Sequence, residues 1–251
     1  MWMVSGAQRE LWTIERLRAE AGGVMTNVLD HGYVKLVETW GSDERFIEAA
    51  RMSTGRGFEG WEKDEKLLAY LYNNNHATPF EMGGMVIEVK APIFVFREWH
   101  RHRTQSYNEM SARYMPLPDE NYLPTLKRVL GGTLETANKQ AQGVAPLDSE
   151  AAYMWLDELE GFYNRAQGLY ESGLIAGVPK ELARLVLPVA RYSRMRASAN
   201  LRNWLAFLTL RKSPKAQWEI RQYADAVGAL VAERFPRTWA LFEKENSYGG
   251  E

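Results

Sequence analysis

Residues 85–102, with the sequence MVIEVKAPIFVFREWHRH, decide the fold class because they pass from one kind of secondary structure to the other. The apolar run 85–89 is typical of a strand. Pro92 suits the first turn of a helix, where its missing N–H leaves no backbone bond unmade. We expect that helix to run to about His102. A strand that leads directly into a helix predicts a chain containing both α and β structure.

The flanking sequence continues this pattern in both directions. Residues 25–40 indicate two strands around a turn at Asp30-His31-Gly32. A further strand is predicted at 192–198. Apolar spacing predicts helices at residues 43–51, 62–72, 155–170, 180–187, 200–211, 216–235 and 238–245. The fold class is therefore predicted as α+β, with a small mixed sheet packed against long helices in a single domain.

The predicted domain spans residues 24–251, and residues 1–23 are interpreted as an N-terminal extension without an assigned function. Residues 115–148 are rich in proline and glycine and are expected to form an irregular excursion, helical only near 126–130. Charged residues among the first twenty argue against a signal peptide. No apolar run reaches the roughly 18 residues that a membrane span needs. We therefore expect a cytoplasmic protein with no membrane partner.

The composition excludes several classes of protein. The chain has 251 residues, of which 31 are basic and 32 acidic, and 45% are apolar. This apolar content and a net charge of −1 are not those of a disordered chain or of a general nucleic-acid coat. The chain contains no cysteine, so it has no disulfide, no thiolate metal site and no cysteine nucleophile.

Polar side chains are densest at residues 101–114, RHRTQSYNEMSARY. Three guanidinium groups, an imidazole, a carboxylate, two amides and two serine hydroxyls lie within these fourteen positions. A solvated surface more often contains lysine and glutamate, whereas arginine offers a planar fork of donors for phosphate or carboxylate. The segment therefore favours a pocket for an anionic ligand over a charged surface.

A second concentration of basic residues lies at 184–212, where six arginines and one lysine without any acidic residue give a local charge of +7. Asn200 is a good N-cap for the helix that follows. Neutralisation by helix carbonyls and distant carboxylates is a sufficient explanation for Arg194 and Arg196. It explains Arg184, Arg202 and Arg211 less well, and these three are candidates for ligand binding.

The pattern R-H-R-x-x-S-x-N-E-x-S-x-R-Y over residues 101–114 resembles the signature of the flavin-dependent thymidylate synthases. The resemblance covers most of the chain outside about the first twenty residues and the excursion at 115–148. Its other matching segments are His76-Ala77-Thr78-Pro79-Phe80-Glu81, residues 91–95, 183–188, 200–211 and 216–220.

This resemblance implies a homotetrameric enzyme that converts dUMP to dTMP. Methylenetetrahydrofolate would be the carbon donor, FAD the hydride carrier and NADPH the reductant. The alternative route to dTMP begins with attack of a cysteine thiolate on uracil, which a chain without cysteine cannot perform. The pyrimidine would instead be activated by polarisation and by a reduced flavin.

The resemblance also implies roles for individual residues. Arg211 matches the catalytic arginine that stabilises negative charge at the N3/O4 edge of uracil. The dUMP-binding positions would be Glu98, Trp99, His100, Arg101, Glu109, Met110, Ser111, Ala112, Arg113, Arg184 and Arg211. The FAD-binding positions would be His76, Thr78, Arg101, His102, Arg103, Glu109, Asn200, Leu201, Arg202 and Ala206.

Two positions depart from the family pattern. Lys215 stands where histidine is expected beside the flavin, and Ala206 stands where a hydrogen-bonding side chain is common. Ser111 is interpreted as a hydrogen-bonding group because no adjacent base would activate it as a nucleophile. The four histidines lack a carboxylate cluster, so we expect no metal site.

Two other functions remain as alternatives. A non-catalytic nucleotide- or RNA-binding protein could use the two arginine-rich segments and stack bases on Tyr107, Tyr114 and Trp204. The near-zero net charge argues against nucleic acid, so the expected partners are dUMP and folate as small molecules. An enzyme that acts on a different pyrimidine nucleotide is the third possibility.

Overall fold

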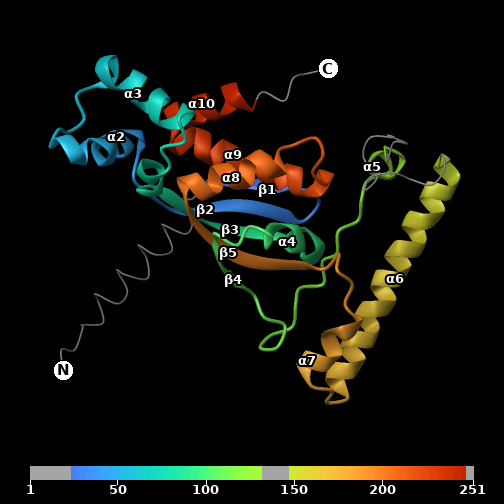
Figure 1. The fold of residues 1–251 in the computed structure, drawn as a ribbon. Coiled ribbons are helices and arrows are strands. Elements are labelled where there is room, and N and C mark those ends of the chain that lie inside the picture. The colour runs from blue at the N-terminus through green and yellow to red at the C-terminus, as the bar shows by residue number, and fades with distance from the viewer. Residues whose placement is uncertain (1–23, 132–146, 247–251) are drawn as a thin grey trace, which may run out of the picture.

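A five-stranded antiparallel sheet lies at the centre of the structure, a computed structural model that describes residues 24–131 and 147–246 (Figure 1). The spatial order of the strands is β1-β2-β3-β5-β4. In chain order the strands are β1 (Met25–Val28), β2 (Gly32–Trp40), β3 (Gly84–Pro92), β4 (Ser106–Glu109) and β5 (Tyr192–Asn200).

The prediction of a mixed sheet is wrong, because every strand pair in the described ranges is antiparallel. A parallel pair needs a connection that crosses to the opposite end of the sheet. Here each long connection leaves and re-enters at the same end. Trp40 at the end of β2 pairs with Gly84 at the start of β3, and Pro92 at the end of β3 pairs with Tyr192 at the start of β5.

The predicted hairpin at 25–40 is confirmed, with a tight turn between β1 and β2. Gly32 opens β2 at a point of close approach. A Cβ atom there would lie 2.0 Å from the Tyr223 hydroxyl and 2.7 Å from the carbonyl oxygen of Lys90. Only glycine fits this position without displacing the neighbouring elements.

The predicted helices are present with modest shifts of their ends. Helix α4 ends at Trp99, three residues before the predicted limit, and the segment 180–187 divides into a short α-helix and a 3₁₀ turn. The helical elements are α2 (Asp43–Arg51), η1 (Met52–Thr54), α3 (Trp61–Asn73), η2 (Thr78–Glu81), α4 (Ile93–Trp99), α5 (Leu126–Leu130), α6 (Ser149–Ile175), α7 (Lys180–Ala183), η3 (Arg184–Val186), α8 (Leu201–Arg211), α9 (Trp218–Arg234) and α10 (Pro236–Glu245).

Helices α8 and α9 cover one face of the sheet, while α2, α3 and α10 gather beside one end of it (Figure 1). The main hydrophobic core lies under α8 and α9 and includes the fully buried rings of Trp99, Trp204, Phe207 and Tyr223. Trp99 packs against Phe207 with ring centroids 4.5 Å apart. This core gives α4 and α8 a fixed relative position, and both helices carry predicted site residues at their C-terminal ends.

Helix α6 stands to one side of the sheet (Figure 1), and its contacts with the sheet lie around Tyr163 and Gln167. The fully buried guanidinium of Arg191 makes one of these contacts, donating to the Pro118 carbonyl (2.8 Å), to Asp119 Oδ1 (2.8 Å) and to Gln167 Oε1 of α6 (2.7 Å). Of the predicted irregular excursion, residues 115–131 contain α5, while 132–146 lie outside the described residues, as does the predicted extension 1–23. No helix in the described part of the chain has the length and apolar character to cross a bilayer.

Candidate functional site

The C-terminal end of α8 meets the C-terminal end of α4 at the guanidinium of Arg211. Its Nη1 donates to Glu98 Oε2 at 2.8 Å and its Nη2 donates to the Glu98 carbonyl oxygen at 2.7 Å. Its Nε donates to His102 Nε2 at 2.8 Å. Only 14% of the Arg211 side chain is exposed. Three hydrogen bonds therefore hold one partly buried cation in a defined orientation.

His102 is an acceptor in this cluster and is consequently a neutral imidazole with its proton on Nδ1. Burial, followed by the positive charge of Arg211, lowers the pKa of His102 to about 4, while Glu98 acts in the opposite direction. The ring also meets Phe207 edge-on, with centroids 4.9 Å apart. The site therefore keeps an unprotonated Nε2 available to Arg211 at neutral pH.

Hydrogen bonds from neighbouring side chains hold the turn that contains His102. The Tyr107 hydroxyl donates to the carbonyl oxygens of His102 (2.7 Å) and Trp99 (3.2 Å). Burial raises the pKa of Tyr107 to about 12, so its hydroxyl remains a donor. Trp99 Nε1 donates to Gln105 Oε1 at 3.1 Å, and Asn203 Nδ2 of α8 donates to the Thr104 carbonyl at 3.1 Å.

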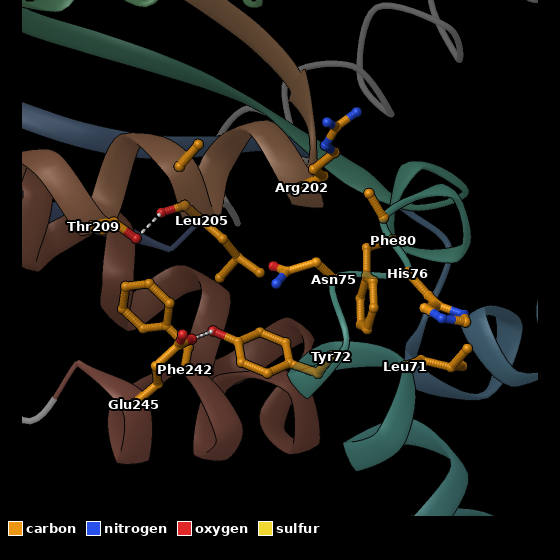
Figure 2. Close-up of a pocket in the computed structure, with 12 residues that line it drawn as sticks. Leu71, Tyr72, Asn75, His76, Phe80, Arg202, Leu205, Thr209, Phe242 and Glu245 are labelled. Carbon is orange, nitrogen blue, oxygen red and sulfur yellow. Dashed lines mark hydrogen bonds between the residues drawn. The ribbon is translucent and has the colours of Figure 1, made fainter.

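A cavity of about 310 Å³ lies between α3, α8 and α10 (Figure 2). Its apolar walls come from core residues such as Leu71, Phe80 and Leu205. Its residues are Leu71, Tyr72, Asn75, His76, Ala77, Phe80, Arg202, Leu205, Ala206, Thr209, Phe242 and Glu245. Figure 2 shows the Asn75 amide pointing into this space and the Tyr72 hydroxyl donating to Glu245, a bond of 2.8 Å.

Three residues of the predicted flavin set, namely His76, Arg202 and Ala206, line this cavity. Arg202 Nη1 donates to Glu81 Oε1 at 2.6 Å, so this arginine pairs with a distant carboxylate. Arg211 does the same with Glu98. Both arginines therefore have carboxylate partners in the fold, and their role in ligand binding stays a prediction. Both partners are far away in sequence and are brought close by packing.

Two further arginines, Arg113 and Arg184, contact Glu181 in α7. Arg113 Nε lies 3.3 Å from Glu181 Oε2, and Arg184 Nε donates to the Glu181 carbonyl at 3.3 Å. The Ser111 hydroxyl accepts from the Arg113 backbone N–H at 3.3 Å. The structure thus brings Arg184 close to Ser111 and Arg113, two predicted nucleotide-binding residues more than seventy positions earlier in the sequence.

Comparison with known proteins identifies the family. The family described as "Thymidylate synthase complementing protein" matches residues 35–237. A flavin-dependent thymidylate synthase from Thermus thermophilus is 44% identical over 89% of this chain and 80% of its own length. One from Thermotoga neapolitana is 40% identical over 86% and 93%. The chain belongs to the flavin-dependent thymidylate synthase family.

Solved structures agree with this assignment. A UMP/dUMP methylase, PolB from Streptomyces cacaoi with 5-Br dUMP bound, superposes with a TM-score of 0.77 at 31% identity, covering 87% of this chain and 97% of that one. The same enzyme with 5-Br UMP bound gives a TM-score of 0.75. A flavin-dependent thymidylate synthase fold therefore extends over most of the described residues.

In this family member, the remaining predicted site residues are either exposed or buried. Arg101, Arg103, Glu109 and Thr78 are exposed and accessible to ligands. Trp99 and Leu201 are fully buried and Ala112 is 5% exposed, so these three residues present almost no surface to a ligand.

Two predicted residues have structural partners, and Met110 is tied to the sheet. The Asn200 side chain accepts from the Asn203 N–H at 3.0 Å as the predicted N-cap of α8, and the His100 ring meets Tyr107 edge-on at 4.9 Å. The Met110 N–H donates to the Arg194 carbonyl at 2.8 Å. Of the two departures from the family pattern, Lys215 is exposed on the loop after α8, and Ala206 lines the cavity.

Sequence reasoning missed several residues that hold the site. Glu181 orients Arg113, Lys180 Nζ donates to the Tyr114 carbonyl at 2.9 Å, and Tyr107 fixes the His102 turn. Glu181 stands three residues before Arg184, which is the only signal in the sequence that could have indicated its role. The others act through contacts that only the fold creates.

Proposed function

We propose that this chain methylates dUMP to dTMP in a flavin-dependent reaction, with methylenetetrahydrofolate as carbon donor and NADPH as reductant. The Arg211 cluster is the observation that carries the proposal, because it presents a fixed cation to a ligand in a chain without cysteine. Membership of the family and the likeness to a methylase with 5-Br dUMP bound support the same substrate.

Arg211 acts on the pyrimidine ring in this proposal. A guanidinium carries five N–H donors, and the bonds to Glu98 and His102 use three of them. The other two are free to donate to the O4 edge of a uracil. Because the group stays charged at every working pH, it stabilises negative charge that develops on the ring without transferring a proton.

Arg113 and Arg184 hold the nucleotide phosphate, with Ser111 as a further donor. Arg113 pairs with the Glu181 carboxylate and Arg184 bonds the Glu181 backbone carbonyl, so both guanidinium groups lie beside Glu181 and would donate to one phosphate bound there. The Arg113 side chain is 60% exposed and Glu181 is 54% exposed, so the carboxylate can move aside when a phosphate arrives.

The cavity and the exposed arginines fit a flavin nucleotide. The apolar walls beside Leu205 and Phe242 suit an aromatic ring system, while Arg202, Arg101 and Arg103 offer cationic donors to the pyrophosphate. His76, Thr78, His102, Glu109, Asn200, Leu201 and Ala206 complete the proposed FAD-contacting set. The bound flavin would supply the hydride for reduction of the transferred carbon.

We propose that the enzyme is a homotetramer and that neighbouring copies cover α6. Large apolar side chains are exposed along α6 and the segment after it, where a lone chain would leave them in water. Examples are Tyr153 (60% exposed), Leu169 (60%), Ile175 (88%) and Leu185 (76%). Sedimentation of the purified protein tests this, with a monomer at micromolar concentration contradicting it.

An anaerobic assay with dUMP, FAD, NADPH and methylenetetrahydrofolate tests the function, with dTMP as the expected product. UMP belongs in a parallel reaction, because the structural neighbour was solved with both 5-Br dUMP and 5-Br UMP. Methylation of UMP alone would identify another pyrimidine nucleotide as the substrate. Absence of product, together with tight and steeply salt-dependent RNA binding, would favour the non-catalytic alternative.

A further inference from the structure

We propose that His102 is a positioning residue, which holds the guanidinium of Arg211 in its working orientation through an unprotonated Nε2. The inference rests on the proposed function, because it concerns the arginine that acts on the uracil ring. It adds a role for His102 in catalysis by Arg211, beyond a contact with the flavin.

Three separate points define the plane of the guanidinium. Glu98 accepts from Nη1 and Nη2 at the far end of the group, and His102 accepts from Nε at its near end. The 42% exposed carboxylate and the backbone carbonyl of Glu98 both bind the Nη end of the guanidinium and leave its Nε end without a partner. The bond from Nε to His102 supplies that partner and fixes where the two unused N–H groups point.

His102 can perform this task because it is itself held on two sides. Its ring packs edge-on against Phe207, which lies one helical turn before Arg211 on the same face of α8. Its carbonyl oxygen accepts the Tyr107 hydroxyl at 2.7 Å. The acceptor nitrogen is therefore placed by the same core that places α8, and the distance between His102 and Arg211 follows from the packing.

The charge of the imidazole must also be zero for the contact to exist. A doubly protonated ring has no acceptor and would direct an N–H against the Nε–H of Arg211. The charged groups that face the ring are Arg211 and Glu98. The nearby titratable group is the Tyr107 hydroxyl, which donates to the His102 carbonyl oxygen. The cation and the partial burial both favour the neutral ring.

The substitutions His102→Ala and His102→Gln separate positioning from flavin contact. Both are assayed at saturating FAD, with His31→Ala as the control, because His31 lies in the exposed turn between β1 and β2 and contacts Asp30 and Tyr192. We expect His102→Ala to lower kcat by about 10- to 100-fold, because a displaced catalytic group loses orientation. Glutamine offers a carbonyl oxygen near the position of Nε2, and His102→Gln is expected to recover most of the loss.

A double-mutant cycle with Arg211→Lys is the second readout. If His102 acts only through Arg211, adding His102→Ala to Arg211→Lys causes little further loss of kcat, so the two effects are strongly non-additive. Normal kcat for His102→Ala at saturating FAD, with a weakened affinity for FAD alone, would overturn the proposal. Additive losses in the cycle would overturn it as well.

A measurement without turnover keeps this test separate from that of the proposed function. In flavin-free protein, the Nε–H of Arg211 should exchange slowly with solvent by NMR in the wild type and in His102→Gln, and quickly in His102→Ala. Equal exchange in all three would contradict the positioning role even if the enzyme makes dTMP. Conversely, slow exchange in a protein that makes no dTMP would refute the proposed function alone.

Discussion

The two groups of arginines in this enzyme are held in opposite ways. Arg211 is 14% exposed and makes three hydrogen bonds of 2.7–2.8 Å, to the carboxylate and backbone carbonyl of Glu98 and to the His102 ring. Arg113 is 60% exposed and, like Arg184, makes only a 3.3 Å contact, in both cases to Glu181. The first arrangement suits a cation that must not move during a reaction, and the second suits cations that close around an arriving phosphate. The comparison teaches that an arginine side chain suits either catalysis or substrate binding, depending on how firmly its hydrogen-bond partners hold it.

The largest effect is expected from Arg211→Ala. Removing a preorganised donor from the site of charge development should lower kcat by about 10³-fold, or about 4 kcal/mol. Arg211→Lys should recover little, because a lysine cannot reproduce three bonds in one plane. Steady-state kinetics with dUMP check this, and Arg45→Ala, at an exposed arginine on α2, serves as the control. Near-normal kcat in Arg211→Ala would remove Arg211 from the catalytic role.

Arg184→Ala should instead act on substrate capture. Loss of a charged hydrogen-bond donor to the phosphate should raise the KM for dUMP by about 10- to 100-fold while kcat changes much less. Arg45→Ala on α2 is again the control, because the Arg45 side chain is 66% exposed and pairs with the neighbouring Glu48. If kcat fell as steeply as it does in Arg211→Ala, the distinction between the two groups would be lost.

Asp43 belongs to neither group of arginines. Asp43→Ala therefore tests whether a loss of folding stability by itself changes the kinetic constants. The buried Asp43 carboxylate accepts from the Arg237 N–H (2.8 Å), the Thr238 N–H (3.2 Å) and the Thr238 hydroxyl (2.6 Å) at the start of α10. Leaving these donors unpaired should reduce the free energy of unfolding by about 2 kcal/mol. Urea unfolding measures the loss, and kcat and KM of the remaining folded enzyme should stay unchanged.

The smallest expected effect is on the pH dependence of stability. The folded state holds the pKa of His102 at about 4, below its usual 6.5, through burial and the charge of Arg211. Between these two values the unfolded chain binds more protons, so His102 makes stability fall as the pH drops from about 6.5 towards 4. His102→Gln should flatten this part of the profile in urea unfolding at pH 5 and pH 7. An unchanged slope would mean that the folded state does not lower the pKa of His102.

The sequence alone predicted the helices and the first hairpin, because apolar spacing and turn residues act locally. It did not predict β4, whose residues Ser106–Glu109 are all polar or partly polar and which pairs only with β5 at the edge of the sheet. It also did not predict the antiparallel arrangement of the sheet. That arrangement depends on where long connections re-enter the sheet, and no local pattern records this.

For the candidate site, the sequence identified the arginines but not their partners. The signature at residues 101–114 contained His102, and the resemblance supplied Arg211, yet nothing in either segment indicates that they meet. Their contact depends on the packing of α4 against the aromatic rings beneath α8. The role of Glu181 depends in the same way on the path of the chain from α6 into α7.

The buried guanidinium of Arg191 has a consequence for how the enzyme assembles. It fastens α6 to the sheet at Gln167, and a short segment joins the end of α6 to the residues that include Glu181 and Arg184. Arg191 therefore links the sheet to the helix that leads into the proposed phosphate-binding residues. Because we propose that neighbouring copies cover α6, we expect the KM for dUMP to depend on assembly, and therefore on protein concentration.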